Sequence, residues 1–277
     1  MNWKGVLDFL KEKKFGLDRK ELVEAETSPV VPDDFCAEEV VYEMNDMGER
    51  EAIERFVPPT RSTATRKPPA RTKGHSRGSM VDPRTNRAIT FASAHEWRCA
   101  LILLASPEIA EVYDQPPAIT YVDAEGKKVK HTPDYLAVSR SGKKCAIAVK
   151  PSRRVEKSGI VDTLDRIKPI LGDYADDIIL LTELQLTHER ATNAESALQA
   201  HSCRVQADCD RVAVIMSGIN GEVNAYDVAK AFGDFPRGMN AIWCLVYDGI
   251  VKLANPALML ADHPFVFRVL QATSVAA

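Results

Sequence analysis

Two consecutive hairpin patterns in residues 119–149 constrain the fold more than any other feature of the chain. Each consists of two short runs of residues that can form strands, separated by a turn that contains a glycine, Gly126 or Gly142. Such runs favour antiparallel strands, because glycine accepts the positive φ that tight hairpin turns need. We therefore expect strands at residues 119–122, 128–131, 135–138 and 145–149.

Helical patterns lie on both sides of these strands. The sequence Ser93-Ala-His-Glu96 has the spacing of a capping box, and apolar residues follow at helical intervals, so a helix is predicted over residues 93–105. Residues 152–172 carry a second apolar helical face, and residues 177–181 form a short apolar run typical of a buried strand. Residues 91–186 are therefore predicted to form an α/β domain.

Residues 187–277 have a different character, because helical patterns dominate them. Three short helices followed by a short strand are typical of a winged helix, so this part is predicted to be mostly helical and winged-helix-like. The expected helices are near residues 191–201, 208–218, 224–232 and 240–246, and the expected strand is at residues 250–253.

Charge is distributed unevenly along the first third of the chain. Residues 1–57 contain 15 acidic and 8 basic residues, a net charge of −7, and residues 4–24 within them show a short amphipathic helical pattern. Residues 58–90 contain 8 basic residues and one acidic residue, a net charge of +7, and are rich in Pro, Ser, Thr and Gly. This composition buries too little apolar surface to offset the entropy of ordering, which predicts a flexible basic arm. The arm either follows phosphates beside a DNA site or is a solvated linker.

The overall composition excludes several classes of protein. With 36 basic and 39 acidic residues the net charge is −3, so any contact with nucleic acid must come from local patches. No apolar run is long enough to span a membrane and the start lacks the apolar stretch of a signal peptide, so we expect a cytoplasmic protein without a membrane partner. The six scattered cysteines fit reduced thiols, and the absence of a P-loop motif argues against ATP binding.

Glu96, Asp134 and Lys150 form the sharpest candidate site. If the second hairpin turns about Gly142, Asp134 lies directly opposite Lys150, and directly opposed side chains of antiparallel strands share a face. Position 148 shares that face because side chains alternate with a period of two. Glu96, in the first turn of the preceding helix, completes the group if that helix packs on the sheet.

Two carboxylates and a lysine in this arrangement suit the cutting of a phosphodiester. That reaction needs a divalent cation to offset charge on the phosphate oxygens and to acidify the attacking water. Mg²⁺ prefers oxygen ligands and usually takes one or two carboxylates, while a lysine can orient the water or stabilise developing charge. Each residue also has a structural interpretation: Glu96 as a capping-box carboxylate, Asp134 as a residue that begins a strand, and Asp134 with Lys150 as a cross-strand ion pair.

Residues from about 90 to 185 resemble the endonuclease domain of the TnsA family, the DNA-cutting subunit of heteromeric (TnsA/TnsB-type) bacterial transposases. The resemblance is carried by short blocks at matching spacing. These blocks are Ser93-Ala-His-Glu96, Gln115-Pro116, Thr132-Pro-Asp134-Tyr135-Leu136, Ala148-Val-Lys150-Pro151, Leu181-Thr-Glu183 and Asn193.

The resemblance implies a restriction-endonuclease-like core with a PD-(D/E)xK-type site, followed by a winged-helix-like domain. In that site Glu96 and Asp134 would bind Mg²⁺, for which Mn²⁺ can substitute, and Lys150 would be the catalytic lysine. The family pattern has a glutamate or glutamine two residues before the lysine, where this chain has Ala148. The backbone carbonyl of Val149, water or the substrate phosphate would then have to complete the metal shell.

The resemblance further implies an endonuclease subunit that nicks one DNA strand at each transposon end. Its implied partners are double-stranded DNA, a DDE-type transposase subunit that cuts and joins the other strand, and an AAA+ ATPase regulator that contacts the C-terminal region. Two other functions stay open: a nuclease-fold scaffold with weak or no activity because of Ala148, and a winged-helix DNA-binding regulator. The side chains expected to contact DNA are Arg71, Lys73 and Arg77 in the arm and Arg153 and Arg154 after Lys150.

Overall fold

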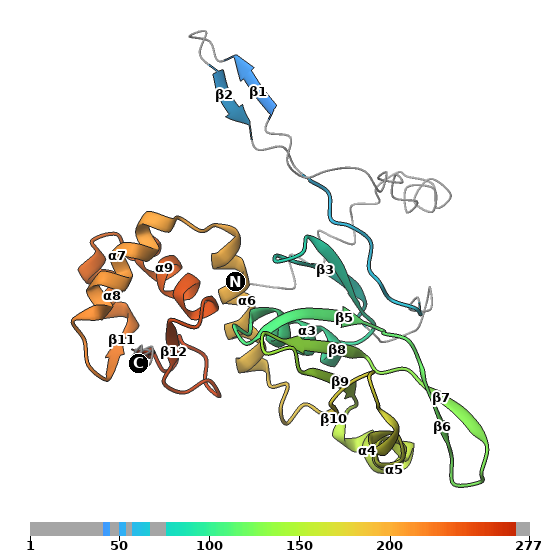
Figure 1. Ribbon diagram of the computed structural model, residues 1–277. Helices are drawn as coiled ribbons and strands as arrows, with labels where there is room; N and C mark the ends of the chain where they lie inside the picture. Colours follow the sequence, from blue (N-terminus) through green and yellow to red (C-terminus); the bar gives the residue numbers. More distant parts are fainter. Residues whose placement is uncertain (1–40, 45–49, 54–56, 67–75, 270–277) are drawn as a thin grey trace, which may run out of the picture. The chain divides into compact units, whose positions relative to one another are not determined.

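The structure is a computed structural model that describes residues 41–44, 50–53, 57–66 and 76–269 (Figure 1). The chain divides by its contacts into two units, Met1–Pro58 and Pro59–Ala277. In the first unit, β1 (Val41–Met44) pairs antiparallel with β2 (Arg50–Ile53). The amphipathic helix predicted within residues 4–24 lies outside the described residues. In the part of the chain that the structure describes, no helix is long and apolar enough to cross a membrane.

A four-stranded mixed sheet forms the core of the second unit. Its strands are β5 (Ile109–Asp114), β8 (Tyr135–Ser139), β9 (Lys144–Val149) and β10 (Asp177–Leu181), in the order β10-β9-β8-β5. β9 pairs parallel with β10 and antiparallel with β8, which pairs antiparallel with β5. The sequence predicts β8, β9 and β10 but not β5, because prolines beside both of its ends make this segment look like a loop.

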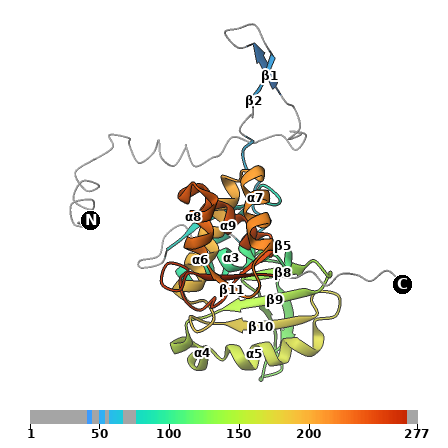
Figure 2. The same ribbon diagram turned by 90° about the vertical axis from the view of Figure 1, so that its left-hand side faces the viewer.

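Helices cover both faces of this sheet. α3 (Ala94–Ala105) packs on one face, in a core that includes Tyr135 and Ile147. α5 (Ile160–Ile167) packs on the other face, in a core that includes Ala146 and Ala148. Figure 2 shows β8, β9 and β10 between these two helices. Successive residues of β9 point to opposite faces, which is why Ile147 and Ala148 belong to different cores.

A glycine divides the helix that the sequence predicts over residues 152–172. Gly159 has a φ of 61°, in the left-handed region, and it separates α4 (Ser152–Ser158) from α5. The single-turn 3-10 helix η1 (Lys168–Ile170) follows α5. Glycine ends α4 at low steric cost, because it has no Cβ to clash in this conformation.

The register of β8 and β9 corrects the sequence prediction by two residues. Tyr135 lies opposite Ile147, whereas a hairpin centred on Gly142 predicts Val149 as its partner. The cause is the turn, because the N–H of Gly142 donates to the carbonyl of Ser139 (2.9 Å) and the hairpin closes one position earlier.

The shift by itself does not change the face of any side chain within the paired strands. A displacement of two residues moves no side chain to the other face of a strand, because the side-chain period is two. The regular pairing ends at Tyr135 and Ile147, and the N–H of Asp134 donates to the carbonyl of Ile147 (2.8 Å), so Asp134 is not the direct partner of Lys150. The prediction of direct opposition was therefore wrong. The predicted face of position 148 was wrong as well, because Ala148 is buried in the apolar core beneath α5 and does not line the cavity that Asp134 and Lys150 line.

Two further hairpins flank the sheet. β6 (Ile119–Val122) and β7 (Lys128–His131) pair antiparallel and confirm the first predicted hairpin. β3 (Gly78–Asp82) and β4 (Arg87–Phe91) also pair antiparallel, and Ile89 of β4 is fully buried in the core beneath α3. The sequence predicts a flexible arm over residues 58–90, so the hairpin corrects that prediction for residues 78–90.

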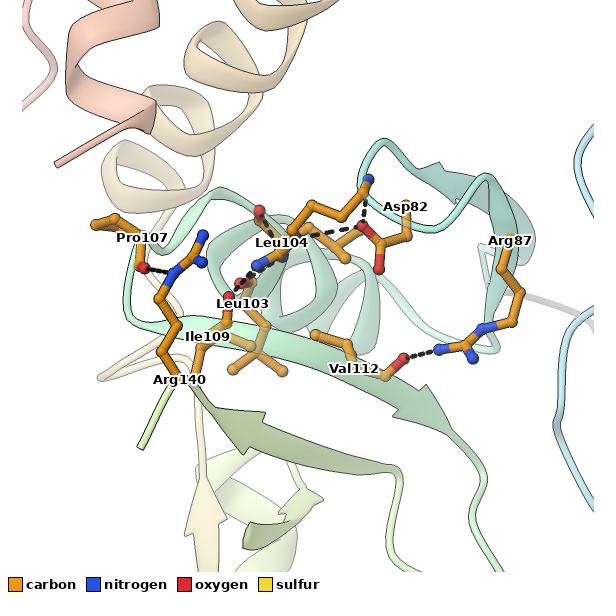
Figure 3. A network of polar contacts seen from close by, with 9 residues as sticks. Asp82, Arg87, Leu103, Leu104, Pro107, Ile109, Val112 and Arg140 are labelled. Carbon is orange, nitrogen blue, oxygen red and sulfur yellow. Dashed lines mark hydrogen bonds and ion pairs between the residues drawn. The ribbon is translucent and has the colours of Figure 1, made fainter. Parts of the chain in front are cut away.

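Arg84 of this hairpin binds the C-terminal end of α3. Figure 3 labels its partners Asp82, Leu103, Leu104 and Ile109. The guanidinium of Arg84 donates to the carbonyls of Leu104 (2.8 Å) and Ile109, and to the buried carboxylate of Asp82 (3.3 Å). The last carbonyls of a helix have no partner within the helix, and a cation there also interacts favourably with the helix dipole. Arg84 therefore joins the hairpin to the core.

Two other arginines make similar contacts in Figure 3. Arg87 of β4 donates to the carbonyl of Val112 in β5 (2.7 Å), and Arg140 donates to the carbonyl of Pro107 (2.7 Å). The positive charge of residues 78–90 is thus used for internal hydrogen bonds, which is why composition alone misrepresents this segment.

The C-terminal part of the second unit is mostly helical, as the sequence predicts. A small antiparallel sheet of order β11-β13-β12 accompanies the helices, and the sequence predicts only β12 of its strands. The elements are α6 (His188–Ser202), α7 (Gln206–Ser217), β11 (Glu222–Asn224), α8 (Ala225–Phe232), α9 (Phe235–Tyr247), β12 (Val251–Leu253) and β13 (Phe265–Arg268).

α6 joins the sheet domain to the helical part, since it packs against both α3 and α9. The buried side chain of Asn193 donates to the carbonyl of Leu258 (2.7 Å) and accepts from the N–H of Leu260 (3.1 Å). An asparagine satisfied on both sides fixes the loop before β13 on α6. The boundaries predicted at residues 90 and 186 stay predictions, because both lie inside one contact unit.

Replacing Arg84 with alanine is expected to lower the free energy of unfolding by about 3 kcal/mol, because the buried carboxylate of Asp82 loses its ion pair and keeps only a backbone N–H, and the carbonyls of Leu104 and Ile109 lose their guanidinium donor. Urea denaturation followed by circular dichroism measures the change. Arg140→Ala is the matched control, because its exposed guanidinium binds one carbonyl at the surface, and we expect a loss of about 1 kcal/mol or less. Equal losses in the two variants would contradict the structural role of Arg84.

Candidate active site

A cavity of about 370 Å³ lies where the start of α3 meets the ends of β8 and β9. Glu96, Asp134 and Lys150, the three residues predicted to carry the chemistry, all line it. The structure thus brings together one side chain from the first turn of a helix and two from neighbouring strand ends. Further lining side chains belong to Arg66, Thr90, Phe91, Gln115, Lys130 and His131.

Glu96 is held by the N-terminus of its own helix. Its carboxylate accepts from the N–H of Ala92 (2.8 Å) and the hydroxyl of Ser93 (2.9 Å), and the Ser93 hydroxyl accepts from the N–H of Glu96 (3.2 Å). The capping interpretation from the sequence is therefore correct. It does not compete with a second role, because each carboxylate oxygen has two lone pairs and Glu96 also lines the cavity.

Asp134 is fixed from both strands that surround it. One carboxylate oxygen accepts from the N–H of Val149 in β9 (2.7 Å), and the other accepts from the side-chain amide of Gln115 (3.2 Å). The alternative of a simple cross-strand ion pair is not observed, because no ion pair joins Asp134 to Lys150 among the described residues.

The surroundings of Asp134 disfavour its charge. Burial, and then the negative charge of Glu96, raise the pKa of Asp134 to about 6, although the Val149 N–H, Lys150 and Gln115 act in the opposite direction. A carboxylate whose ionised form is destabilised by a neighbouring carboxylate gains more from a bound cation than an isolated one does. The pair Glu96 and Asp134 is therefore suited to a positive ligand.

Ala148 contributes only a methyl group. It is fully buried in the apolar core beneath α5, together with Ile160 and Leu164. Position 148 therefore supplies no side-chain oxygen to the cavity. The bond from Val149 to Asp134 places the backbone of β9 beside the carboxylate, where the sequence predicts the Val149 carbonyl as a ligand.

Lys150 extends the pairing of β9 with β10, because its N–H donates to the carbonyl of Leu181 (3.0 Å). Its ammonium makes no ion pair with any described residue, and its positive charge, together with burial, lowers the pKa of His131. His131 lines the cavity, and its Nε2 is buried with no hydrogen-bond partner in the described part of the chain.

His95 lies outside the cavity lining. Its Nε2 is 3.7 Å from the carboxylate of Glu183, which also accepts from the N–H of Ser152 at the start of α4 (2.9 Å). The hydrogen bonds from Ser152 lower the pKa of Glu183 to about 2. Glu183 therefore holds the start of α4, directly after Lys150 and Pro151.

Two side chains that hold the site could not be assigned from patterns alone. Gln115 has a φ of 40°, a strained value for a residue with a Cβ, and both its N–H and its amide bind Asp134. The fully buried Tyr135 donates to the carbonyls of Glu96 (3.1 Å) and Thr90 (3.3 Å), and so fixes the first turn of α3 over β8. For Gln115, the only indication in the sequence was the block Gln115-Pro116, which did not show what the side chain does.

Of the five residues predicted to contact DNA, two lie outside the described residues and the other three do not line this cavity. Arg71 and Lys73 lie outside the described residues. Arg77 is half-buried just before β3, while Arg153 and Arg154 are exposed on α4. None of these last three lines the cavity.

The residues present fit a hard divalent cation with few protein ligands. Among the described residues, no group of three His, Cys, Asp or Glu side chains could hold a metal ion. Mg²⁺ does not require such a group, because it retains several waters and takes one or two carboxylates. Glu96 and Asp134, with the backbone of Val149 beside them, meet that requirement.

Asp134→Asn is expected to stabilise the metal-free protein at pH 8 by up to about 3 kcal/mol, because it removes a charge that folding disfavours by roughly two pKa units. The folded-state pKa lies above that of the unfolded chain, so the difference should vanish as the pH falls from about 6 towards 4. Thermal unfolding across this range measures it, with Asp165→Asn on α5 as the matched control. A variant no more stable than the parent at pH 8 would contradict this electrostatic account.

Comparison with known protein families gives an independent result for this region. The family model described as TnsA-like endonuclease N terminal matches residues 106–201. Gln115, Asp134 and Lys150 lie within the match, and Glu96 lies ten residues before it. No curated protein matches the chain. The chain thus carries a TnsA-like endonuclease domain, which confirms the family resemblance that its motifs predict.

Proposed function

We propose that this chain is a Mg²⁺-dependent DNA endonuclease of a Tn7-like transposition system and nicks one strand at each transposon end. The observation that carries the proposal is the cavity lined by Glu96, Asp134 and Lys150, within and just before a TnsA-like endonuclease domain. Double-stranded DNA is its substrate, and Mn²⁺ substitutes for Mg²⁺ because both accept carboxylate and water ligands.

Each of the three residues has a defined task. Glu96 and Asp134 would hold the cation, and the carbonyl of Val149 and water would supply the remaining ligands. A cation bound there supplies a Lewis acid for the attacking water and the phosphate oxygens. Lys150 donates to the attacking water or to a phosphate oxygen, and no ion pair with a described residue competes for its ammonium.

The fold supports a restriction-endonuclease-like core. The mixed sheet has a helix on each face, and the candidate site lies where the hairpin of β8 and β9 opens towards α3. In the C-terminal part, the order α7, β11, α8, α9, β12, β13 with one antiparallel sheet supports a winged-helix-like domain.

We assign this C-terminal domain to protein contacts rather than to DNA. A DNA-reading helix must present side chains to a groove, but α9 packs against α6, α7 and α8. Its arginine, Arg237, is bound to the carboxylate of Asp208 (2.6 Å). This packing argues against the regulator alternative. The proposed partners are a DDE-type transposase subunit and, through the C-terminal region, an AAA+ ATPase.

Purified protein, its transposase partner and DNA with the transposon ends are expected to give a nicked product in Mg²⁺ or Mn²⁺. Asp134→Ala and Lys150→Ala should reduce the nicking rate by about 100-fold or more, because each removes a group that acts on the reacting phosphate. Lys143→Ala, at an exposed position of the β8–β9 turn, is the matched control and should cut normally. Unchanged cutting by the Asp134 or Lys150 variant would remove that residue from the mechanism.

Ala148 provides the test between an active nuclease and a nuclease-fold scaffold. Because its methyl is fully buried under α5, Ala148→Gln should destabilise the protein by about 1–3 kcal/mol without faster nicking. Thermal unfolding and the nicking assay measure the two effects. A clear gain of nicking in Ala148→Gln or Ala148→Glu would instead identify the present chain as the scaffold. Mn²⁺ titration by calorimetry gives a second discriminator, because a scaffold should show no binding that depends on Asp134.

A further inference from the structure

Residues 59–66, which we call the strap, run from β4 to the candidate active site. At its start, the N–H of Thr60 donates to the carbonyl of Asn86 (2.8 Å), and the N–H of Ala88 donates to the carbonyl of Thr60 (2.9 Å). Thr60 forms a parallel bridge with Arg87. The strap therefore begins as a short additional strand beside β4, although the sequence predicts a flexible arm here.

A buried carboxylate anchors the middle of the strap. The hydroxyl of Ser62 donates to Asp114 at 2.7 Å, and the same carboxylate oxygen accepts from the N–H of Thr90 at 2.7 Å. Asp114 is 0% exposed. Hydrogen bonds to a charged group away from water are stronger than neutral surface bonds, so this contact fixes the strap firmly.

Gln115, which directly follows Asp114 in the chain, holds the end of the strap. Both the N–H and the hydroxyl of Thr65 donate to the carbonyl of Gln115, at 3.0 and 2.9 Å. Gln115 in turn binds Asp134 through its N–H and its side-chain amide. The strap is thus connected to the candidate metal ligand through one residue with a strained backbone.

These anchors determine where Arg66 lies. It follows Thr65 directly and lines the cavity with Glu96, Asp134 and Lys150. Its guanidinium makes no hydrogen bond or ion pair with a described residue. Three fixed contacts thus hold Arg66 at the candidate active site, where no described residue binds its guanidinium, so this group is available to a ligand.

We propose that Arg66 binds a DNA backbone phosphate at the active site and that the strap serves to place its guanidinium there. The inference rests on the proposed function, since it takes DNA as the substrate. A guanidinium offers a planar pair of donors that matches two phosphate oxygens, and it stays charged at every pH at which a nuclease works. The carboxylates of the cavity can then serve the cation while Arg66 and Lys150 serve the phosphate.

The test is the salt dependence of DNA binding by the full-length chain, measured by fluorescence anisotropy with a labelled 40-base-pair duplex in metal-free buffer. Loss of one phosphate contact in Arg66→Ala should weaken binding roughly tenfold and lower the slope of log Kd against log salt by about 1. Arg66→Lys should retain the slope, because it keeps the charge. Arg61→Ala is the matched control: it removes an exposed arginine of the same strap that does not line the cavity, and it should leave the slope unchanged.

The strap itself is tested by Ser62→Ala, which removes the bond to Asp114 and leaves Arg66 in the chain. We expect Ser62→Ala to bind DNA more weakly than the parent chain. The double variant Ser62→Ala/Arg66→Ala should bind DNA almost as tightly as Arg66→Ala alone, because both changes act through the same phosphate contact.

The outcomes separate this inference from the proposed function. Absence of nicking by the parent chain, with binding that depends on Arg66, would refute the nuclease and leave the phosphate site intact. Normal nicking by the parent, with identical binding slopes for Arg66→Ala and Arg61→Ala, would overturn the inference alone. A parent chain that does not bind the duplex at all would overturn it as well.

Discussion

At the open end of the β8–β9 hairpin, the regular pairing ends at Tyr135 and Ile147, and Asp134 binds β9 through both its backbone N–H and its carboxylate. The carboxylate of Asp134 accepts the N–H of Val149, which brings a negative charge into a partly buried position beside Glu96. Ordinary core residues avoid such an arrangement because it destabilises the fold. Here it is retained at a cavity, where a bound cation would relieve it, so the arrangement of the surrounding residues follows from this single contact.

Three neighbours hold that carboxylate and its partner in position. Gln115, directly after β5, binds Asp134 with its backbone in the left-handed region. Tyr135 fixes the helix that carries Glu96, and Ser93 fixes the Glu96 carboxylate itself. The polar groups that bind the pair come from the residues before α3, from β9 and from the residue after β5, so the geometry of the site depends on the packing of α3 and β5 against β8.

The arginines of residues 58–90 show how little charge alone says about role. Arg84 and Arg87 bind backbone carbonyls of the core, and their contribution is structural. Arg66 has the same chemistry but stands at the cavity without a described protein partner. A net charge of +7 describes both kinds equally. The difference lies in the neighbouring residues, Thr60, Ser62 and Thr65, whose hydrogen bonds fix the chain beside the core.

Local patterns in the sequence were sufficient for α3, the two central hairpins, β10 and the C-terminal helices, because capping, alternation and helical periodicity are properties of neighbouring residues. They also predicted Glu96, Asp134 and Lys150 as one site, and the structure places all three around one cavity. Tertiary structure alone decided the register of β8 and β9, the strands β3, β4 and β5, the buried methyl of Ala148 and the course of residues 59–66. Each of these depends on a partner distant in sequence: a turn that closes one position earlier, a core that covers Ile89, or a carboxylate in β5 that binds Ser62. Such contacts leave no periodic trace in the chain, because only folding brings their two sides together.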